Sequence, residues 1–394
     1  MIKKLFIVIV ILVLLALAVV YAFRHEIFQV SAETIIKKNL PSYITVEAIV
    51  FDLKNGVMRV KEMGIKNPPE FTNKELAHIR SITCTYKMKG DNILDGIEVT
   101  GIEASGGTII IERLSDGRLN VNEMGPVMEE GAKRSKSAQQ ESKGGNHRKS
   151  LDISRWIKLP DTIDLKEGKV VFLDNAVMPR PYRLTFEDID SELGIRLNKD
   201  YTKVTAVSSK GTGSLQGDRA QQVRWITSLD PDRRELTMSN RFEISNIDII
   251  PFRPYYDPYS PLEIQSGVFS GTLVFDFDNG NIGSTNTVRL RNLRFRQKMD
   301  DSSQRYWVAA IPDIIKYLET SPGEITFDFK IKGPMDDPRF YPGPVVKRAI
   351  QNMAVDKISE LLAPPEEQEG QVTEKSDAQK VVDVISELLK NQDQ

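Results

Sequence analysis

The feature that most constrains this chain is an unbroken apolar run near its amino terminus, from Leu5 to Phe23. Roughly 19 helical residues at 1.5 Å each nearly match the hydrocarbon core of a bilayer. A cleaved signal peptide has an apolar region of only about 7–15 residues. The run therefore predicts a retained transmembrane anchor over residues 1–24, with cleavage beside Ala16-Leu17-Ala18 as the alternative.

Two lysines, Lys3 and Lys4, precede the run, and the positive-inside rule keeps such residues in the cytoplasm. The single cysteine, Cys84, lies far from the run, so a lipid-modified amino-terminal cysteine is not available as the anchor. We therefore expect a single-pass protein of a bacterial inner membrane, with the bulk of the chain in the periplasm.

The composition excludes some functions and constrains the core. The 53 basic and 55 acidic side chains give a net charge of −2, which provides no general attraction to nucleic acid. One cysteine in an oxidising compartment cannot form an internal disulfide, so packing and strand pairing must hold the chain together. Because Cys84 falls in a strand-like run, we expect it to be buried and not reactive.

A mainly β fold is predicted by the periodicity after Ile44. Apolar residues alternate with polar ones, and Asn55-Gly56 and Asn279-Gly280 supply the preferred two-residue hairpin turn. Such strands, with one apolar and one polar face, suit an antiparallel sheet. Between Met128 and Ser150 apolar residues nearly vanish, as is typical of a disordered linker.

These patterns predict five segments along the chain. They are the anchor at 1–24, a short helix and β-meander at 25–127, the linker at 128–150, a β-domain at 151–342, and amphipathic helices joined by an acidic linker at 343–394. The last segment contains a near-duplicate, VDKISELL at Val355–Leu362 and VDVISELL at Val382–Leu389. Its apolar stripes indicate burial either against the protein's own sheet or against an envelope protein partner.

No catalytic constellation emerges from the sequence. His25 adjoins the anchor, His78 lies in a charged turn and His147 lies in the linker, and none is at nucleophile or metal-ligand spacing. We therefore expect no enzyme activity, no cofactor and no metal.

Two strands show the clearest alternation of apolar and polar side chains. Their apolar positions are Leu273, Phe275, Phe277, Ile325, Phe327 and Phe329. An apolar sheet face of this kind suits either an open groove that covers acyl chains or the core of a closed sandwich. The pattern alone leaves both interpretations open.

Four stretches resemble AsmA-like envelope proteins, especially a branch catalogued as a domain of unknown function. They are IKNP at Ile65–Pro68, IIIERLSDGRLNVN at Ile109–Asn122, PFRPYYDPYSPLEIQSG at Pro251–Gly267 and GPMDDPRF at Gly333–Phe340. The motif residues of the last two stretches are Pro251, Phe252, Pro254, Tyr255, Gly267, Asp336, Asp337, Pro338 and Phe340. The resemblance covers most of residues 1–122 and 155–350.

The resemblance implies a membrane-anchored β-groove, or open taco-like sheet, that binds or conducts phospholipid for outer-membrane biogenesis. It favours the groove interpretation of the alternating strands, with the six apolar positions as lipid-facing candidates. The alternative is a structural scaffold that recruits envelope-assembly partners through the carboxy-terminal helices.

Overall fold

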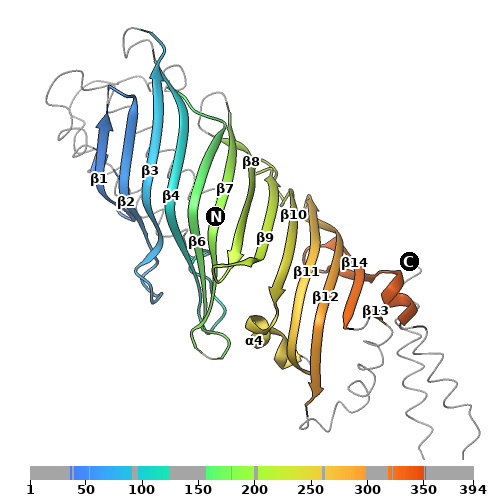
Figure 1. Ribbon diagram of the computed structural model, residues 1–394. Helices are drawn as coiled ribbons and strands as arrows, with labels where there is room; N and C mark the ends of the chain where they lie inside the picture. Colours follow the sequence, from blue (N-terminus) through green and yellow to red (C-terminus); the bar gives the residue numbers. More distant parts are fainter. Residues whose placement is uncertain are drawn as a thin grey trace, which may run out of the picture. The chain divides into compact units, whose positions relative to one another are not determined.

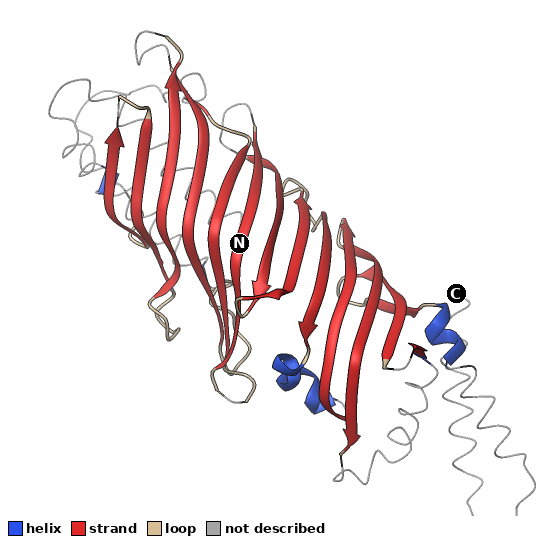
Figure 2. Cartoon of the chain, in the orientation of Figure 1, coloured by secondary structure: helices blue, strands red, loops and turns tan. Residues whose placement is uncertain are grey.

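The computed structural model confirms that the chain is mainly β, with few helices (Figures 1 and 2). It describes residues 36–37, 40–52, 54–90, 96–124, 157–178, 180–198, 203–259, 262–298, 318–321, 323–349 and 351. The predicted anchor, the linker and the duplicated carboxy-terminal sequences lie outside these ranges and stay predictions. Within the described ranges, no helix is long and apolar enough to cross a membrane. The chain divides into two units, Met1–Met238 and Ser239–Gln394.

The first unit is a sheet whose strands follow one another in the order β1-β2-β3-β4-β6-β7-β8-β9, with the short β5 beside β4. Their bounds are β1 Ile44–Asp52, β2 Val57–Lys66, β3 Glu75–Met88, β4 Ile97–Arg113, β5 Ile157–Lys158, β6 Thr162–Asp174, β7 Tyr182–Leu197, β8 Val204–Leu215 and β9 Asp218–Leu229. Among the described strands of this unit, β1 and β9 do not pair, so the sheet does not close on itself.

The pairing is antiparallel except at β4, which runs parallel to both β5 and β6. This differs from the antiparallel prediction. Consecutive strands joined by tight turns must run in opposite directions, as β1 and β2 do around Gly56 at φ 62°. Residues 114–161 separate β4 from β6 in the sequence. Two parallel neighbours need a long connection of this kind, because the chain must return to the end of the sheet where β4 began.

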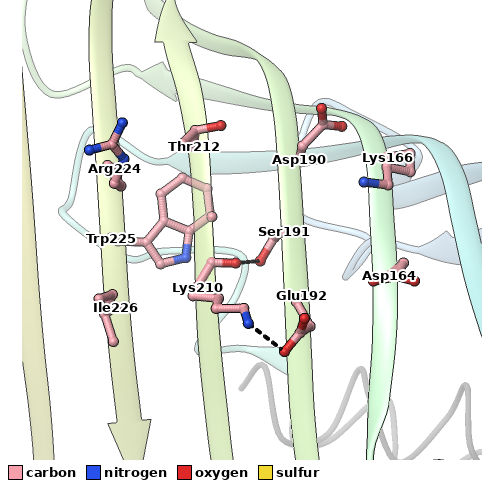
Figure 3. Close-up of a pocket in the computed structure, with 11 residues that line it drawn as sticks. Asp164, Lys166, Asp190, Ser191, Glu192, Lys210, Thr212, Arg224, Trp225 and Ile226 are labelled. Atoms are coloured by element: carbon pink, nitrogen blue, oxygen red, sulfur yellow. Dashed lines mark hydrogen bonds and ion pairs between the residues drawn. The ribbon is translucent and has the colours of Figure 1, made fainter.

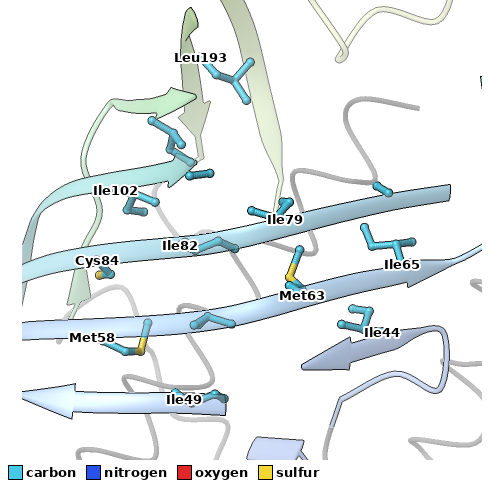
Figure 4. Packing of buried hydrophobic residues seen from close by; sticks show 14 of the residues in the cluster. Ile44, Ile49, Met58, Met63, Ile65, Ile79, Ile82, Cys84, Ile102 and Leu193 are labelled. Atoms are coloured by element: carbon cyan, nitrogen blue, oxygen red, sulfur yellow. The ribbon is translucent and has the colours of Figure 1, made fainter. Parts of the chain in front are cut away.

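One face of β1–β4 forms a tightly buried core (Figure 4). Met58, Ile82 and Cys84 are at most 1% exposed, and Ile36 and Met124 pack against the same cluster. Burial raises the pKa of the Cys84 thiol to about 12, because the apolar surroundings oppose the charged thiolate. The prediction that Cys84 is buried is therefore confirmed.

The sheet of the first unit is interrupted along one line across its strands. Glu62 on β2, Gly106 on β4, Glu167 on β6 and Asp188 on β7 have positive φ angles of 48°, 65°, 53° and 51°. The strand registers of β2–β3, β3–β4, β4–β6 and β6–β7 skip these four residues, so they have no Cα partner in those ladders. Such interruptions bend strands and increase their twist, and here they recur at the same level in adjacent strands.

The structure describes six strands in the second unit: five follow the order β10-β11-β12-β14-β13, and β15 also pairs with β14. Their bounds are β10 Met238–Asp248, β11 Leu262–Asp278, β12 Asn281–Gln297, β13 Glu319–Ser321, β14 Glu324–Pro334 and β15 Arg339–Pro342. The predicted Asn279-Gly280 turn joins β11 to β12, with both residues at positive φ. Three short helices, η3 Ile250–Phe252, α4 Arg253–Tyr256 and η4 Asp257–Tyr259, precede β11. A helical turn follows β15 over residues 344–349.

Candidate functional site

The six apolar positions predicted from the sequence share one face of the second unit. Leu273 of β11 lies opposite Asn286 of β12, which in turn lies opposite Phe329 of β14. The other four follow from the same registers and the two-residue period, because residues at even spacing along a strand face the same side. Phe275 pairs with Ser284, Phe277 with Ile282, Phe327 with Val288 and Ile325 with Leu290.

This face, which we call the phenylalanine face, is only partly covered. Ile325 is 3% exposed, whereas the other five candidates are half-buried. The rings of Phe327 and Phe329 have centroids 6.2 Å apart, and Phe329 stacks on Phe340 at 5.2 Å. Phe340 is 58% exposed. The phenylalanine face therefore continues to a motif residue that the sequence pattern had not assigned to it.

The opposite face of the same strands is polar and internally bonded. Arg289 pairs with Glu324 at 2.9 Å, and the Thr287 hydroxyl donates to Asp328 at 2.7 Å. The sheet of the second unit thus has one apolar and one solvated side, as the alternation predicts.

A shallow hollow of about 360 Å³ lies over β6–β9 of the first unit (Figure 3). Its charged lining residues balance, three acids against three bases: Asp164, Asp190, Glu192, Lys166, Lys210 and Arg224. Lys210 pairs with Glu192 at 3.0 Å, and the Trp225 indole donates to the Ser209 hydroxyl at 3.0 Å. These two bonds link β7 to β8 and β8 to β9 at the hollow.

The two amino-terminal motif stretches meet in a buried hydrogen-bond network. Asn120 donates to Asn67 at 3.1 Å, and its side-chain oxygen accepts from the Glu112 backbone at 2.9 Å. The Glu112 carboxylate, 1% exposed, accepts from Asn73 and from the Thr72 backbone at 3.0–3.2 Å. Burial opposes ionisation of Glu112, but the hydrogen bonds from Asn73 and Thr72 outweigh it and lower its pKa. These motif residues connect a loop to the end of β4.

The carboxy-terminal motif residues also make bonds within the chain. Pro251, Phe252, Pro254 and Tyr255 lie in η3 and α4, where Arg253 bonds Asp257 at 3.0 Å and Glu263 at 2.8 Å.

Close approach explains the glycine of the same motif. A Cβ on Gly267 would lie 2.5 Å from the Ile249 side chain. Asp336, Asp337 and Pro338 form the turn from β14 to β15, where Asp337 N donates to Pro334 O at 3.1 Å. Gly267 thus lies inside β11 next to two register shifts, whereas Phe340 stacks on Phe329 of the phenylalanine face.

Two polar residues of the phenylalanine face were missed by the sequence reasoning, Ser284 and Asn286 on β12. The signal was present, because the alternation Ile282, Ser284, Asn286, Val288 places them on the apolar side. Among the described residues, no group of three or more His, Cys, Asp or Glu side chains is placed to hold a metal ion.

No family model and no curated protein matches the chain. The resemblance to AsmA-like proteins therefore rests on the quoted motifs.

Proposed function

We propose that this chain is a non-enzymatic protein of the AsmA-like type, anchored in a bacterial inner membrane, that binds or conducts phospholipid for outer-membrane biogenesis. The phenylalanine face is the proposed site for the acyl chains. The observation that carries this proposal is the half-burial of Leu273, Phe275, Phe277, Phe327 and Phe329 on a single sheet face.

An incompletely covered apolar face is a favourable surface for a hydrocarbon chain. Covering it removes apolar area of both partners from water, at roughly 0.8 kcal/mol for each methylene buried. The polar face of the same strands would remain solvated, so binding requires no burial of charge. Phe340, 58% exposed and stacked on Phe329, adds apolar area that a bound chain would cover.

The test combines bound lipid and stability in the same purified full-length variants. Native mass spectrometry measures copurifying phospholipid, and thermal unfolding gives the midpoint. Phe275→Asn and Phe327→Asn should each lose lipid with modest destabilisation, because an open face can partly hydrate an amide. Thr326→Asn places the same amide on the polar face of β14 and should change neither quantity.

A closed core would respond differently. Both phenylalanine variants would then lose about 3 kcal/mol or more and fail to fold stably. That result, together with wild-type protein that carries no phospholipid but a bound protein, would replace the proposal by a scaffold that recruits envelope partners through residues 343–394.

A further inference from the structure

A polar pair interrupts the phenylalanine face at its centre. Ser284 and Asn286 lie on β12, opposite Phe275 and Leu273 of β11 respectively. Ser284 is 5% exposed and Asn286 is 0% exposed. Polar groups buried in an apolar surface are costly unless their hydrogen bonds are complete, so each bond of this pair needs to be accounted for.

Three hydrogen bonds are present, and they fix the direction of each group. The Val274 backbone N–H donates to Asn286 Oδ1 at 3.1 Å, which places the amide Nδ2 on the other side. Asn286 Nδ2 then donates to Ser284 Oγ at 2.8 Å, and Ile331 N donates to the same Oγ at 2.7 Å. If Oδ1 and Nδ2 of Asn286 were exchanged, the amide N–H would face the backbone N–H of Val274, and two donors would meet. The orientation given above is therefore the consistent one.

Two donors remain. A hydroxyl has two lone pairs and one hydrogen, and both lone pairs of Ser284 are already used. Its hydrogen, and the second hydrogen of Asn286 Nδ2, have no acceptor among the residues that the structure describes. Hydrogen bonds within the sheet therefore satisfy the acceptor atoms of Ser284 and Asn286 but leave these two donor hydrogens without an acceptor. The site lacks one acceptor oxygen.

We propose that the hydroxyl of Ser284, which Asn286 holds in place, donates a hydrogen bond to an acyl carbonyl oxygen of the ligand on the phenylalanine face. The half-buried Phe275 and Phe329 would flank the hydrocarbon, and the carbonyl is the one strong acceptor attached directly to an acyl chain. This inference rests on the proposed function and deepens it, because it specifies an acyl group and excludes a plain alkyl chain. The carbonyl can belong to a phospholipid ester or to a free fatty acid.

The experiment compares ligands that differ only at this oxygen. Full-length protein is equilibrated with mixed micelles containing equal amounts of diester and diether phosphatidylcholine of the same chain length. The protein is then isolated and the retained lipids are quantified by mass spectrometry. Wild type should retain the ester over the ether by roughly five- to tenfold, the effect of one or two buried hydrogen bonds. A parallel arm with palmitate separates a carboxyl source from an ester source.

Three variants identify the groups responsible. Ser284→Ala should reduce the ester-to-ether ratio toward one, whereas Ser284→Thr keeps a hydroxyl and should preserve it. Thr285→Val removes a hydroxyl from the neighbouring position on the polar face and should leave the ratio unchanged. If Ser284→Ala does not fold, the wild-type ratio alone still decides.

Each outcome has a distinct meaning. Equal retention of ester and ether by wild type, without preferential binding of palmitate, would overturn the inference and assign the two donors to water, while the proposed function would stand. An ester preference that survives Ser284→Ala would also overturn it. Retention of none of the three ligands would refute the proposed function itself.

Discussion

Truncating one apolar side chain in each unit tests whether the phenylalanine face is less completely buried than the core face of β1–β4. Ile82 on β3 is 1% exposed, whereas Leu273 on β11 is half-buried. Replacing either by alanine removes three carbons, or about 2.4 kcal/mol of transfer free energy at full burial. The cavity left behind increases this to about 3–4 kcal/mol for Ile82→Ala. At Leu273 the side chain is partly exposed, so less than the full transfer free energy applies, and solvent can fill the space, so we expect about 1–2 kcal/mol.

Native-state hydrogen exchange followed by mass spectrometry suits a chain with two units. Peptides from β3 report the opening free energy around Ile82, and peptides from β11 and β12 report that around Leu273. Each variant is compared with wild type in the full-length protein. Thr83→Ala on β3 and Thr272→Ala on β11 serve as controls on the more polar faces and should each change the opening free energy by less than about 1 kcal/mol.

One result would contradict the expected difference between Ile82→Ala and Leu273→Ala. If Leu273→Ala lowers the opening free energy of β11 as much as Ile82→Ala lowers that of β3, the phenylalanine face is a closed core. The reasoning from half-burial, and the lipid proposal built on it, would then be refuted.

Three further predictions concern the first unit. The pKa of Glu112 is lower in the folded state, so its contribution to the free energy of unfolding is complete above the unfolded pKa of about 4.3 and is lost as pH falls through the folded pKa. Glu112→Gln should therefore flatten the pH dependence of urea unfolding in that acidic range. At neutral pH it should lower the free energy of unfolding by about 1–3 kcal/mol. Gln216 has φ 51° in the turn before Gly217, so Gln216→Asn should raise the urea midpoint by the equivalent of about 0.5 kcal/mol, and a lower midpoint would contradict this reasoning. Cys84 should react with a thiol reagent only in denaturant, and rapid labelling of folded protein would show that β3 opens easily.

The sequence predicted those features of the fold that depend on local chemistry. Asn-Gly turns require positive φ at both positions, and the pair at Asn279-Gly280 joins β11 to β12 as predicted. The prediction of the same two-residue turn at Asn55-Gly56 is wrong, because only Gly56 has positive φ and four residues separate Asp52 from Val57. Strict alternation likewise placed Phe275 and Phe327 on one face, because side chains alternate sides along every strand.

Other features depend on contacts between distant segments and have no local signal. Glu62, Glu167 and Asp188 hold positive φ angles that these residue types rarely adopt, and only the aligned interruption of neighbouring strands accounts for them. The parallel pairing of β4 with β6 follows from the route of a long connection, which periodicity does not specify. The degree to which the phenylalanine face is covered depends equally on tertiary packing.

The motif residues and the residues of the phenylalanine face have different roles, and this difference explains why the candidate site is harder to predict than the fold. Glu112, Asn120 and Arg253 each need a specific partner at hydrogen-bond distance, so their identities leave recognisable motifs in the sequence. Apolar burial is non-directional, so many large apolar side chains would serve at the position of Phe275 or Phe327. A phenylalanine face therefore leaves only a periodic pattern, which a closed core would leave as well. The pair Ser284 and Asn286 is different, because its remaining donors are directional, and this makes it the part of the face where residue identity can reveal the ligand.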